Sequence, residues 1–146
     1  MKNTVLLIEG EEKTGRLLKQ ALVSDGIEVT WVTDGKMALA KVEKAKFDLI
    51  VMELRLPGTP GDEVLAGIRK IDPYVEVIVY SDDQNPAIMK KLINLGVDGY
   101  LDKRGETDLW ETVAEVKARL RPFSEEERDK LLDSAPEGIF DSQDLN

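Results

Sequence analysis

The sequence of 146 residues contains no cysteine and no histidine. Without cysteine the chain forms no disulfide and has no thiol nucleophile. Without histidine it lacks the base of serine–histidine catalysis and the usual ligands of zinc sites. No nucleophile–base pair is therefore visible, and a small-molecule enzyme has little support. We expect the chain not to be an enzyme.

Long apolar runs are also missing. A membrane-spanning helix needs about 20 consecutive apolar residues, and no segment approaches that length. The first ten residues are too short and too soon acidic for a signal peptide, so we expect a cytoplasmic location. The chain has 20 basic and 29 acidic residues, a net charge of −9. That balance disfavours non-specific binding to nucleic acid or to an anionic membrane.

The charge distribution divides the chain into a domain and an extension. Residues 121–146 carry eight acidic and only three basic residues, and Pro122 disfavours helix in the residue before it. We therefore predict one domain over 1–120 and an acidic C-terminal extension over 121–146. Within the extension, a short helix is predicted to begin near Ser124. The remainder is predicted to be disordered unless it docks.

Five short apolar runs alternate with segments of helical spacing across the first 120 residues. Continuous apolar runs of this length are typical of strands buried on both faces. The short connections favour parallel strands, each followed by a helix. The sequence thus predicts an α/β fold with a five-stranded parallel sheet flanked by five helices. The expected strands are 4–8, 28–32 near an edge, 48–52 at the centre, 75–80 and 97–101. Asp62 is expected to be the N-cap of the third helix.

Candidate functional residues follow the predicted strands. In parallel sheets, ligands bind outside the carboxyl ends of the strands, near the point where the strand order switches. The residues expected there are Glu9, Gly10 and Glu11 after the first strand, Glu53 and Arg55 after the third, Ser81 after the fourth and Lys103 after the fifth. Together they outline a site for a cation or an oxyanion. The segment IEGEEKTG lacks the glycine spacing of phosphate-binding loops, which disfavours nucleotide binding.

Three segments, FDLIVMELRLPGTPGDEVL, VIVYSDD and LGVDGYLDK, give the chain a family resemblance over residues 3–120. It resembles the receiver domain of bacterial two-component response regulators. The resemblance implies a flavodoxin-like strand order and a role in a phosphorelay, in which a histidine kinase transfers a phosphoryl group to an aspartate ending the third strand. It also implies magnesium, held by that aspartate, an acidic pair after the first strand and a backbone carbonyl.

Half of the family's functional residues match this sequence. Ser81 and Lys103 stand at the positions that bind the phosphoryl oxygens, and Tyr100 stands at the switch aromatic. Each also has a simpler interpretation: Ser81 as a turn or cap residue, Lys103 as a solvated surface charge, and Tyr100 as a packing residue. Trp31 and Trp110 are expected to be packing residues.

The acidic half departs from the family's pattern. Glu53 occupies the acceptor position, where the family has Asp, and the acidic pair is reduced to Glu9 and Gly10, with Glu11 next to them. A misplacement of about 1 Å costs on the order of a hundredfold in rate, and magnesium demands near-ideal octahedral geometry. We therefore expect phosphotransfer to be lost or very weak and no cofactor to be bound. If magnesium does bind, Glu9, Glu53 and Arg55 are its expected ligands.

The sequence therefore predicts a pseudo-receiver, a module that binds proteins without phosphorylation. Glu53 is expected to reach Lys103 and imitate part of the charge arrangement of a phosphorylated receiver, with Arg55 as an alternative partner of Glu53 or Glu9. The competing hypothesis is a magnesium-dependent phosphoacceptor. The expected partner is a histidine kinase or a downstream target, and a homodimer is possible. The family's binding face, formed by the fourth helix, fifth strand and fifth helix, would present Met89, Lys90, Asn94, Tyr100, Asp102 and residues around Trp110 and Val113.

Overall fold

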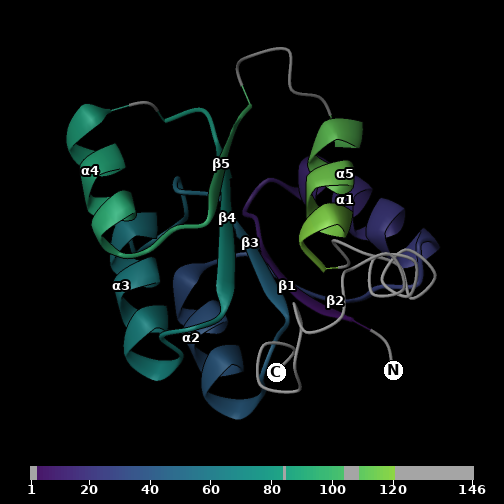
Figure 1. Cartoon of the computed structure of the whole chain (residues 1–146), viewed down its shortest axis with the longest axis horizontal. Coiled ribbons are helices and arrows are strands. Elements are labelled where there is room, and N and C mark those ends of the chain that lie inside the picture. Colours follow the sequence, from purple (N-terminus) through teal and green to yellow (C-terminus); the bar gives the residue numbers. More distant parts are fainter. Residues whose placement is uncertain (1–2, 84, 104–108, 121–146) are drawn as a thin grey trace, which may run out of the picture.

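The computed structural model of the chain describes residues 3–83, 85–103 and 109–120. A parallel sheet lies at its centre, and each strand is followed by a helix (Figure 1). The strands are β1 (Thr4–Ile8), β2 (Glu28–Val32), β3 (Leu49–Met52), β4 (Glu76–Ser81) and β5 (Gly99–Asp102). The helices are α1 (Glu12–Ser24), α2 (Gly35–Lys44), α3 (Gly61–Ile71), α4 (Pro86–Asn94) and α5 (Leu109–Leu120). The predicted extension, 121–146, lies outside the described residues.

The strand order is β2-β1-β3-β4-β5, and every pairing is parallel. This confirms the predicted α/β fold, with β3 at the centre and β2 at an edge. The chain moves outward from β1 to β2 and then crosses to β3 on the other side of β1. The order therefore switches between β1 and β3, whose ends pair at Ile8 and Met52. A ligand site is expected above that pair.

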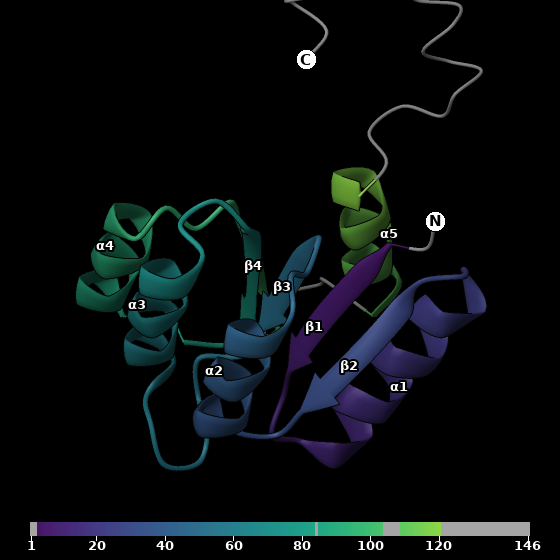
Figure 2. The same ribbon diagram turned by 90° about the horizontal axis from the view of Figure 1, so that it is seen from below.

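The helices cover the sheet in two layers. Helices α1 and α5 lie on one face, and α2, α3 and α4 lie on the other (Figures 1 and 2). Strands β1 and β3 have apolar side chains buried on both faces, for example Leu6 against the α2–α4 layer and Leu7 against the α1–α5 layer. Two apolar cores therefore fix the sheet from both sides. No helix in the described part of the chain is both long and apolar enough to cross a membrane.

Three local predictions need correction. Ser81 is the last residue of β4 rather than the first residue after it, because its partner Asp102 continues the ladder. Strand β5 begins at Gly99, two residues later than expected. Asp62 is not the N-cap of α3. Pro60 is, because the Gly61 amide already donates to Leu54 O at 2.9 Å, which starts the helix one residue before Asp62.

Helix α4 is held mainly at its ends. Its one fully buried side chain is Leu92, and its N-cap, Asn85, accepts a hydrogen bond from the Ala87 amide at 2.9 Å. At the other end, the Arg69 guanidinium from α3 donates to carbonyl oxygens of the turn after α4 and of the segment before β4. Those acceptors are Leu95 O at 2.8 Å, Gly96 O at 2.8 Å and Val75 O at 2.6 Å. Arg69 therefore fastens α4 to α3 and to the sheet.

Candidate functional site

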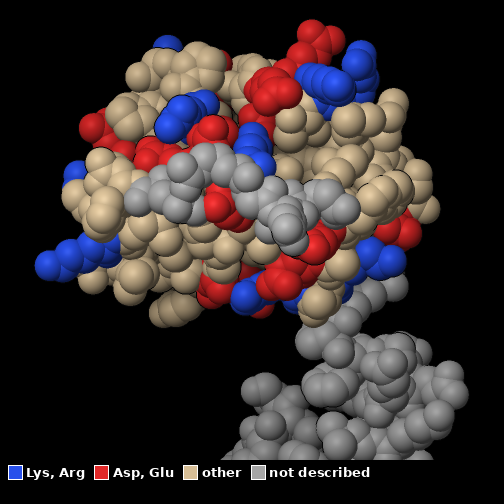
Figure 3. Space-filling view, turned by 90° about the horizontal axis from the view of Figure 1, so that it is seen from above, with Lys and Arg blue, Asp and Glu red and all other residues tan. Residues whose placement is uncertain are grey.

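The sheet ladder itself positions the candidate residues. Three of them stand directly after a strand, and each uses its backbone amide to bond the last carbonyl of the neighbouring strand. These bonds are Glu9 N to Val32 O at 3.0 Å, Glu53 N to Ile8 O at 2.9 Å and Lys103 N to Ser81 O at 3.0 Å. Their side chains consequently start from fixed points at the carboxyl edge, which is the side of the molecule viewed in Figure 3. Acidic and basic side chains are interspersed on that side.

One ammonium joins two buried carboxylates at this edge. Lys103 Nζ lies 3.0 Å from Glu53 Oε1 and also donates to Glu9 Oε1. Glu9 is 3% and Glu53 8% exposed, and the Lys103 side chain is 15% exposed. The ammonium also stands 5.0 Å from the centre of the Tyr80 ring, within the range of a cation–π contact. We call Glu9, Glu53 and Lys103 the charge triad.

The remaining carboxylate oxygens of the charge triad have partners too. Glu53 Oε2 accepts from the Leu54 amide at 2.6 Å, and Glu9 Oε2 accepts from the Glu11 amide at 3.2 Å. All four carboxylate oxygens therefore receive a hydrogen bond. Buried polar groups are stable when satisfied in this way. The two carboxylates of the triad therefore need no further hydrogen-bond donor.

Burial and charge act on the triad in opposite directions. Burial raises the pKa of Glu9 above its usual range, although the hydrogen bond from Lys103 works against that rise. For Lys103, burial alone would lower the pKa. The hydrogen bonds and charges of Glu9 and Glu53 outweigh burial, so the pKa of the ammonium is raised. The lysine therefore stays charged, and one ammonium serves two carboxyl groups.

The residues at this edge do not fit a resident magnesium ion. Gly10 supplies no side-chain oxygen, and Lys103 occupies the side on which Glu9 and Glu53 face each other. A Cβ added at Gly10 would stand 3.1 Å from Pro57 Cδ and 3.3 Å from Thr33 O, a tight fit. Among residues 3–83, 85–103 and 109–120, no three acidic side chains are grouped so that they could hold a metal ion.

Arg55 does not take the role that one sequence interpretation gave it. Its Nε lies 3.3 Å from Asp82 Oδ1, and its side chain is 66% exposed. The cation that reaches the buried carboxylates is the ammonium of Lys103, because β5 delivers this side chain directly over the ends of β1 and β3. Arg55 instead ties the loop after β3 to the loop after β4.

The loop after β4 connects Ser81 and Tyr100, because its residue Asp83 forms a hydrogen bond with each of them. Ser81 is fully buried, and its Oγ accepts from the Asp83 amide at 3.3 Å. The Tyr100 hydroxyl donates to Asp83 O. Burial, and next the charge of Asp83, raise the pKa of Tyr100, so the phenol keeps its proton. Ser81 does not cap α4, since Asn85 does.

Trp31 has a site contact that sequence reasoning missed. Its indole Nε1 donates to Glu9 O at 2.9 Å, and the ring packs on α1 against Gly15. A Cβ at Gly15 would stand 2.2 Å from the ring, so glycine makes this approach possible. Trp31 therefore packs, as predicted, and also fixes the backbone of the residue that begins the charge triad. A lone glycine inside a helical pattern was the available signal.

The expected binding face is only partly exposed. Residues around Val113 were assigned to it, and Val113 itself is 4% exposed, because α5 turns this side toward the sheet. Trp110 was expected to pack but is 69% exposed, and Ile93 on α4 is 69% exposed as well. Tyr100 is half-buried and packs against the core on the α2–α4 side of the sheet. The other residues assigned to the face are at least partly exposed: Met89, Lys90, Asn94 and Asp102.

Comparisons with known proteins agree with this geometry. Residues 5–114 match the family described as the response regulator receiver domain. The transcriptional regulatory protein PcoR of Escherichia coli is 32% identical over 117 residues, covering 80% of this chain and 51% of PcoR. The sensory transduction protein RegX3 of Mycobacterium bovis is 31% identical over 138 residues, covering 91% of this chain and 59% of RegX3. The chain thus spans about half the length of these relatives.

The same fold occurs among solved structures. A CheY-like response regulator receiver domain protein from Methanospirillum hungatei JF-1 matches with a TM-score of 0.77. Sequence identity is 22%, and the match covers 89% of this chain and 99% of that protein. At this identity the likeness shows the fold alone.

Proposed function

Since the chain belongs to the family of response regulator receiver domains, we propose that it is a signalling module that binds its protein partner without being phosphorylated. The observation that carries the proposal is the charge triad. A single lysine side chain fills the space between the two buried carboxylates, in a family whose chemistry needs that space for a cation and a phosphoryl group.

Glu53 is held in a geometry that works against nucleophilic attack. Its Oε1 is bonded to Lys103 and its Oε2 to the Leu54 amide at 2.6 Å. Each oxygen already accepts one hydrogen bond through one of its two lone pairs, and that bond draws charge away from the oxygen that would attack. The extra methylene of glutamate also moves the carboxylate from the place that aspartate takes. Both effects disfavour phosphoryl transfer to this side chain.

Lys103 is engaged in the same way. By family resemblance, this lysine binds an oxygen of the incoming phosphoryl group. Here its ammonium already bonds the two glutamates, and their charges raise its pKa against the effect of burial. We propose that this standing arrangement replaces the charge pattern that phosphorylation creates in other receivers, and that no resident magnesium is needed.

The proposed partner is a protein, either a histidine kinase or a downstream target. Ile93 and Trp110 support the face formed by α4, β5 and α5, because both are large apolar side chains left 69% exposed. Ile93 lies beside exposed polar residues of α4, Lys90 and Asn94, and an apolar side chain rimmed by polar residues favours protein contact. The alternative partner at this face is a second copy of the chain, which would form a homodimer.

Titration with magnesium and then with beryllium fluoride, a phosphoryl mimic, tests the proposal. Trp31 is a suitable fluorescent reporter because its indole bonds Glu9 O. The Trp110→Phe background removes the other tryptophan. We expect no saturable change with either ligand. We also expect mass spectrometry to detect no phosphoryl adduct after incubation with a small phosphoryl donor such as acetyl phosphate.

A matched control makes the negative result meaningful. The double variant Gly10→Asp/Glu53→Asp supplies the two aspartates that the family pattern has and this chain lacks. It should respond to magnesium and beryllium fluoride at concentrations where the parent does not, provided that Pro57 yields by a few tenths of an ångström at Gly10. Saturable millimolar binding of magnesium by the parent, followed by a beryllium fluoride response, would refute the proposal and establish the phosphoacceptor alternative.

A further inference from the structure

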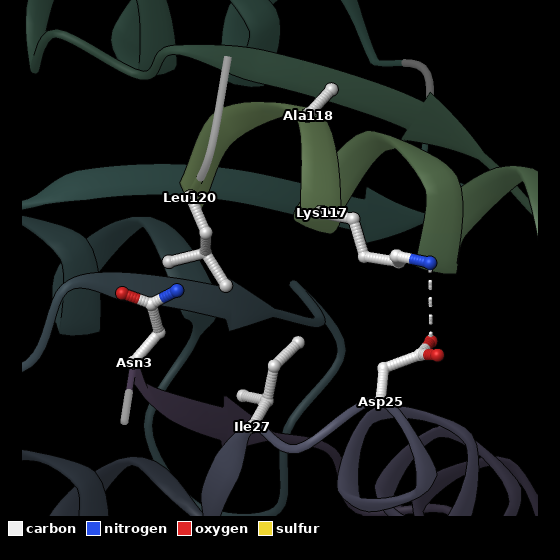
Figure 4. A pocket seen from close by; sticks show the side chains of 6 residues that line it. All are labelled: Asn3, Asp25, Ile27, Lys117, Ala118 and Leu120. Atoms are coloured by element: carbon white, nitrogen blue, oxygen red, sulfur yellow. Dashed lines mark ion pairs between the residues drawn. The ribbon is translucent and has the colours of Figure 1, made fainter. Parts of the chain in front are cut away.

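A pocket of about 240 Å³ opens at the amino edge of the sheet, on the opposite side from the charge triad. It lies between the segments leading into β1 and β2 on one side and the last turn of α5 on the other (Figure 4). The residues that line it are Asn3, Asp25, Ile27, Lys117, Ala118 and Leu120. The proposed function leaves this pocket unused.

The pocket has an apolar floor and a neutralised rim. The side chains of Ile27 and Leu120 face each other across it (Figure 4), and Ile27 is 7% exposed. At the rim, Lys117 Nζ lies 3.6 Å from Asp25 Oδ2, so the two charges are paired. A charged ligand therefore finds no unpaired side-chain charge in this lining, whereas an apolar group finds two aliphatic side chains.

The chain itself continues from the wall of this pocket. Leu120 is the last residue of α5, and residues 121–146 follow it. Pro122 cannot donate the helical hydrogen bond and disfavours helix in the residue before it. Phe123 comes next and is the first large apolar residue after Leu120. We propose that the pocket is the docking site of the Phe123 side chain, so that the acidic extension begins by folding back on the domain.

Size and reach both fit a phenyl ring. An engineered apolar cavity of about 150 Å³ is large enough to bind benzene, so 240 Å³ has room for the ring of Phe123. Three residues span at most about 10 Å, and the pocket begins at Leu120 itself. Phe140 offers the same ring from a tether of 20 residues, and effective concentration falls as a flexible tether lengthens. Phe123 is therefore the favoured occupant.

This docking has two effects on the molecule. It joins the end of α5 to the segment before β2, near the Lys117–Asp25 ion pair at the rim. It also starts the extension at the amino edge, away from the charge triad at the carboxyl edge.

Methyl NMR on the full chain tests the proposal directly. With Ile and Leu methyl groups labelled, we expect nuclear Overhauser contacts from the Phe123 ring to methyl groups of Ile27 and Leu120. The ring should also displace the Ile27 methyl signal by its ring current. Phe123→Ala should abolish both effects, whereas Phe140→Ala, the matched control, should leave them unchanged. Phe123→Leu should keep the contacts but lose the ring-current displacement.

Each opposing outcome identifies another occupant or none. Contacts from Phe140 in place of Phe123 would overturn the assignment. Contacts that appear only between differently labelled chains in a mixed sample would show a second copy in the pocket and overturn the intramolecular form. Identical chemical shifts of the Ile27 methyl groups in the parent and in Phe123→Ala would show that Phe123 does not enter the pocket. None of these results depends on whether the charge triad accepts a phosphoryl group.

Discussion

Removing the ammonium of the charge triad is the sharpest perturbation the structure offers. Lys103→Met keeps a long, flexible side chain of similar reach but leaves Glu9 and Glu53 facing each other with no cation between them. Both carboxylates are almost fully buried, and the lysine side chain is 15% exposed. The triad is therefore unlike a surface ion pair, whose loss costs about 1 kcal/mol or less.

The expected cost at pH 7 is about 3–5 kcal/mol of unfolding free energy, the range for breaking a buried pair by removing one partner. The variant should recover as the pH falls. Burial already raises the pKa of Glu9 from the ordinary 4.5 in the parent, and without Lys103 it rises further. A carboxyl with a raised folded pKa binds its proton more tightly in the folded state, so stability increases as the pH falls toward 4.5.

Urea unfolding at pH 7 and pH 5 measures both effects. Lys117→Met is the matched control, because Lys117 pairs with Asp25 while 52% of its side chain is exposed, and it should lose at most about 1 kcal/mol. The triple variant Glu9→Gln/Glu53→Gln/Lys103→Met should regain most of the loss, since no buried charge is left. A Lys103→Met loss no larger than that of Lys117→Met, with no pH dependence, would refute the reasoning about the triad.

Three further predictions concern the groups around the triad. The pKa of Lys103 is raised from 10.5, so its stabilising effect is present below pH 10.5 and disappears as the pH rises through the folded value; urea unfolding above pH 10.5 should show a loss that Lys103→Met lacks. Gly15→Ala puts a methyl group into the Trp31 ring and should cost about 1–3 kcal/mol, with a tryptophan emission shift as the indole leaves Glu9 O. Arg69→Leu leaves the carbonyls beside α4 without their donor and should cost about 1–3 kcal/mol, with faster amide hydrogen exchange in α4 than in α1; equal exchange in both helices would contradict the clamp.

The sheet was predictable because its strands are written as unbroken apolar runs. In β1 and β3 the side chains on both faces are buried. Their sequences are therefore continuous apolar runs of strand length, the pattern from which these strands were predicted. The errors fall where hydrophobicity does not decide the backbone. Ser81 is polar yet extends β4, because Asp102 pairs with it. Asp62 has the chemistry of a cap, but the hydrogen bond from the Gly61 amide to Leu54 O, in the loop just before the helix, lets α3 start one residue earlier.

The members of the candidate site were predictable, but their arrangement was not. The positions of Glu9, Glu53 and Lys103 follow from the strand ends. The shared ammonium depends on the length of the lysine side chain and on the path of β5, neither of which the sequence displays. The bond from Trp31 to Glu9 O joins residues 22 apart and depends on the missing side chain of Gly15. In the sequence, Arg69 looks like an ordinary basic residue in the last turn of α3. Only its tertiary hydrogen bonds show that it fastens α4 to α3 and to the sheet.

Lys103 has one more consequence. A cation that arrives by diffusion has an occupancy, which falls with dilution or with a chelator in the medium. The ammonium of the charge triad is attached to the backbone, so every molecule holds one ammonium for its two carboxylates. Under the proposed function, the signalling-competent amount of the protein equals the total amount, and output would follow how much of the chain the cell makes and degrades.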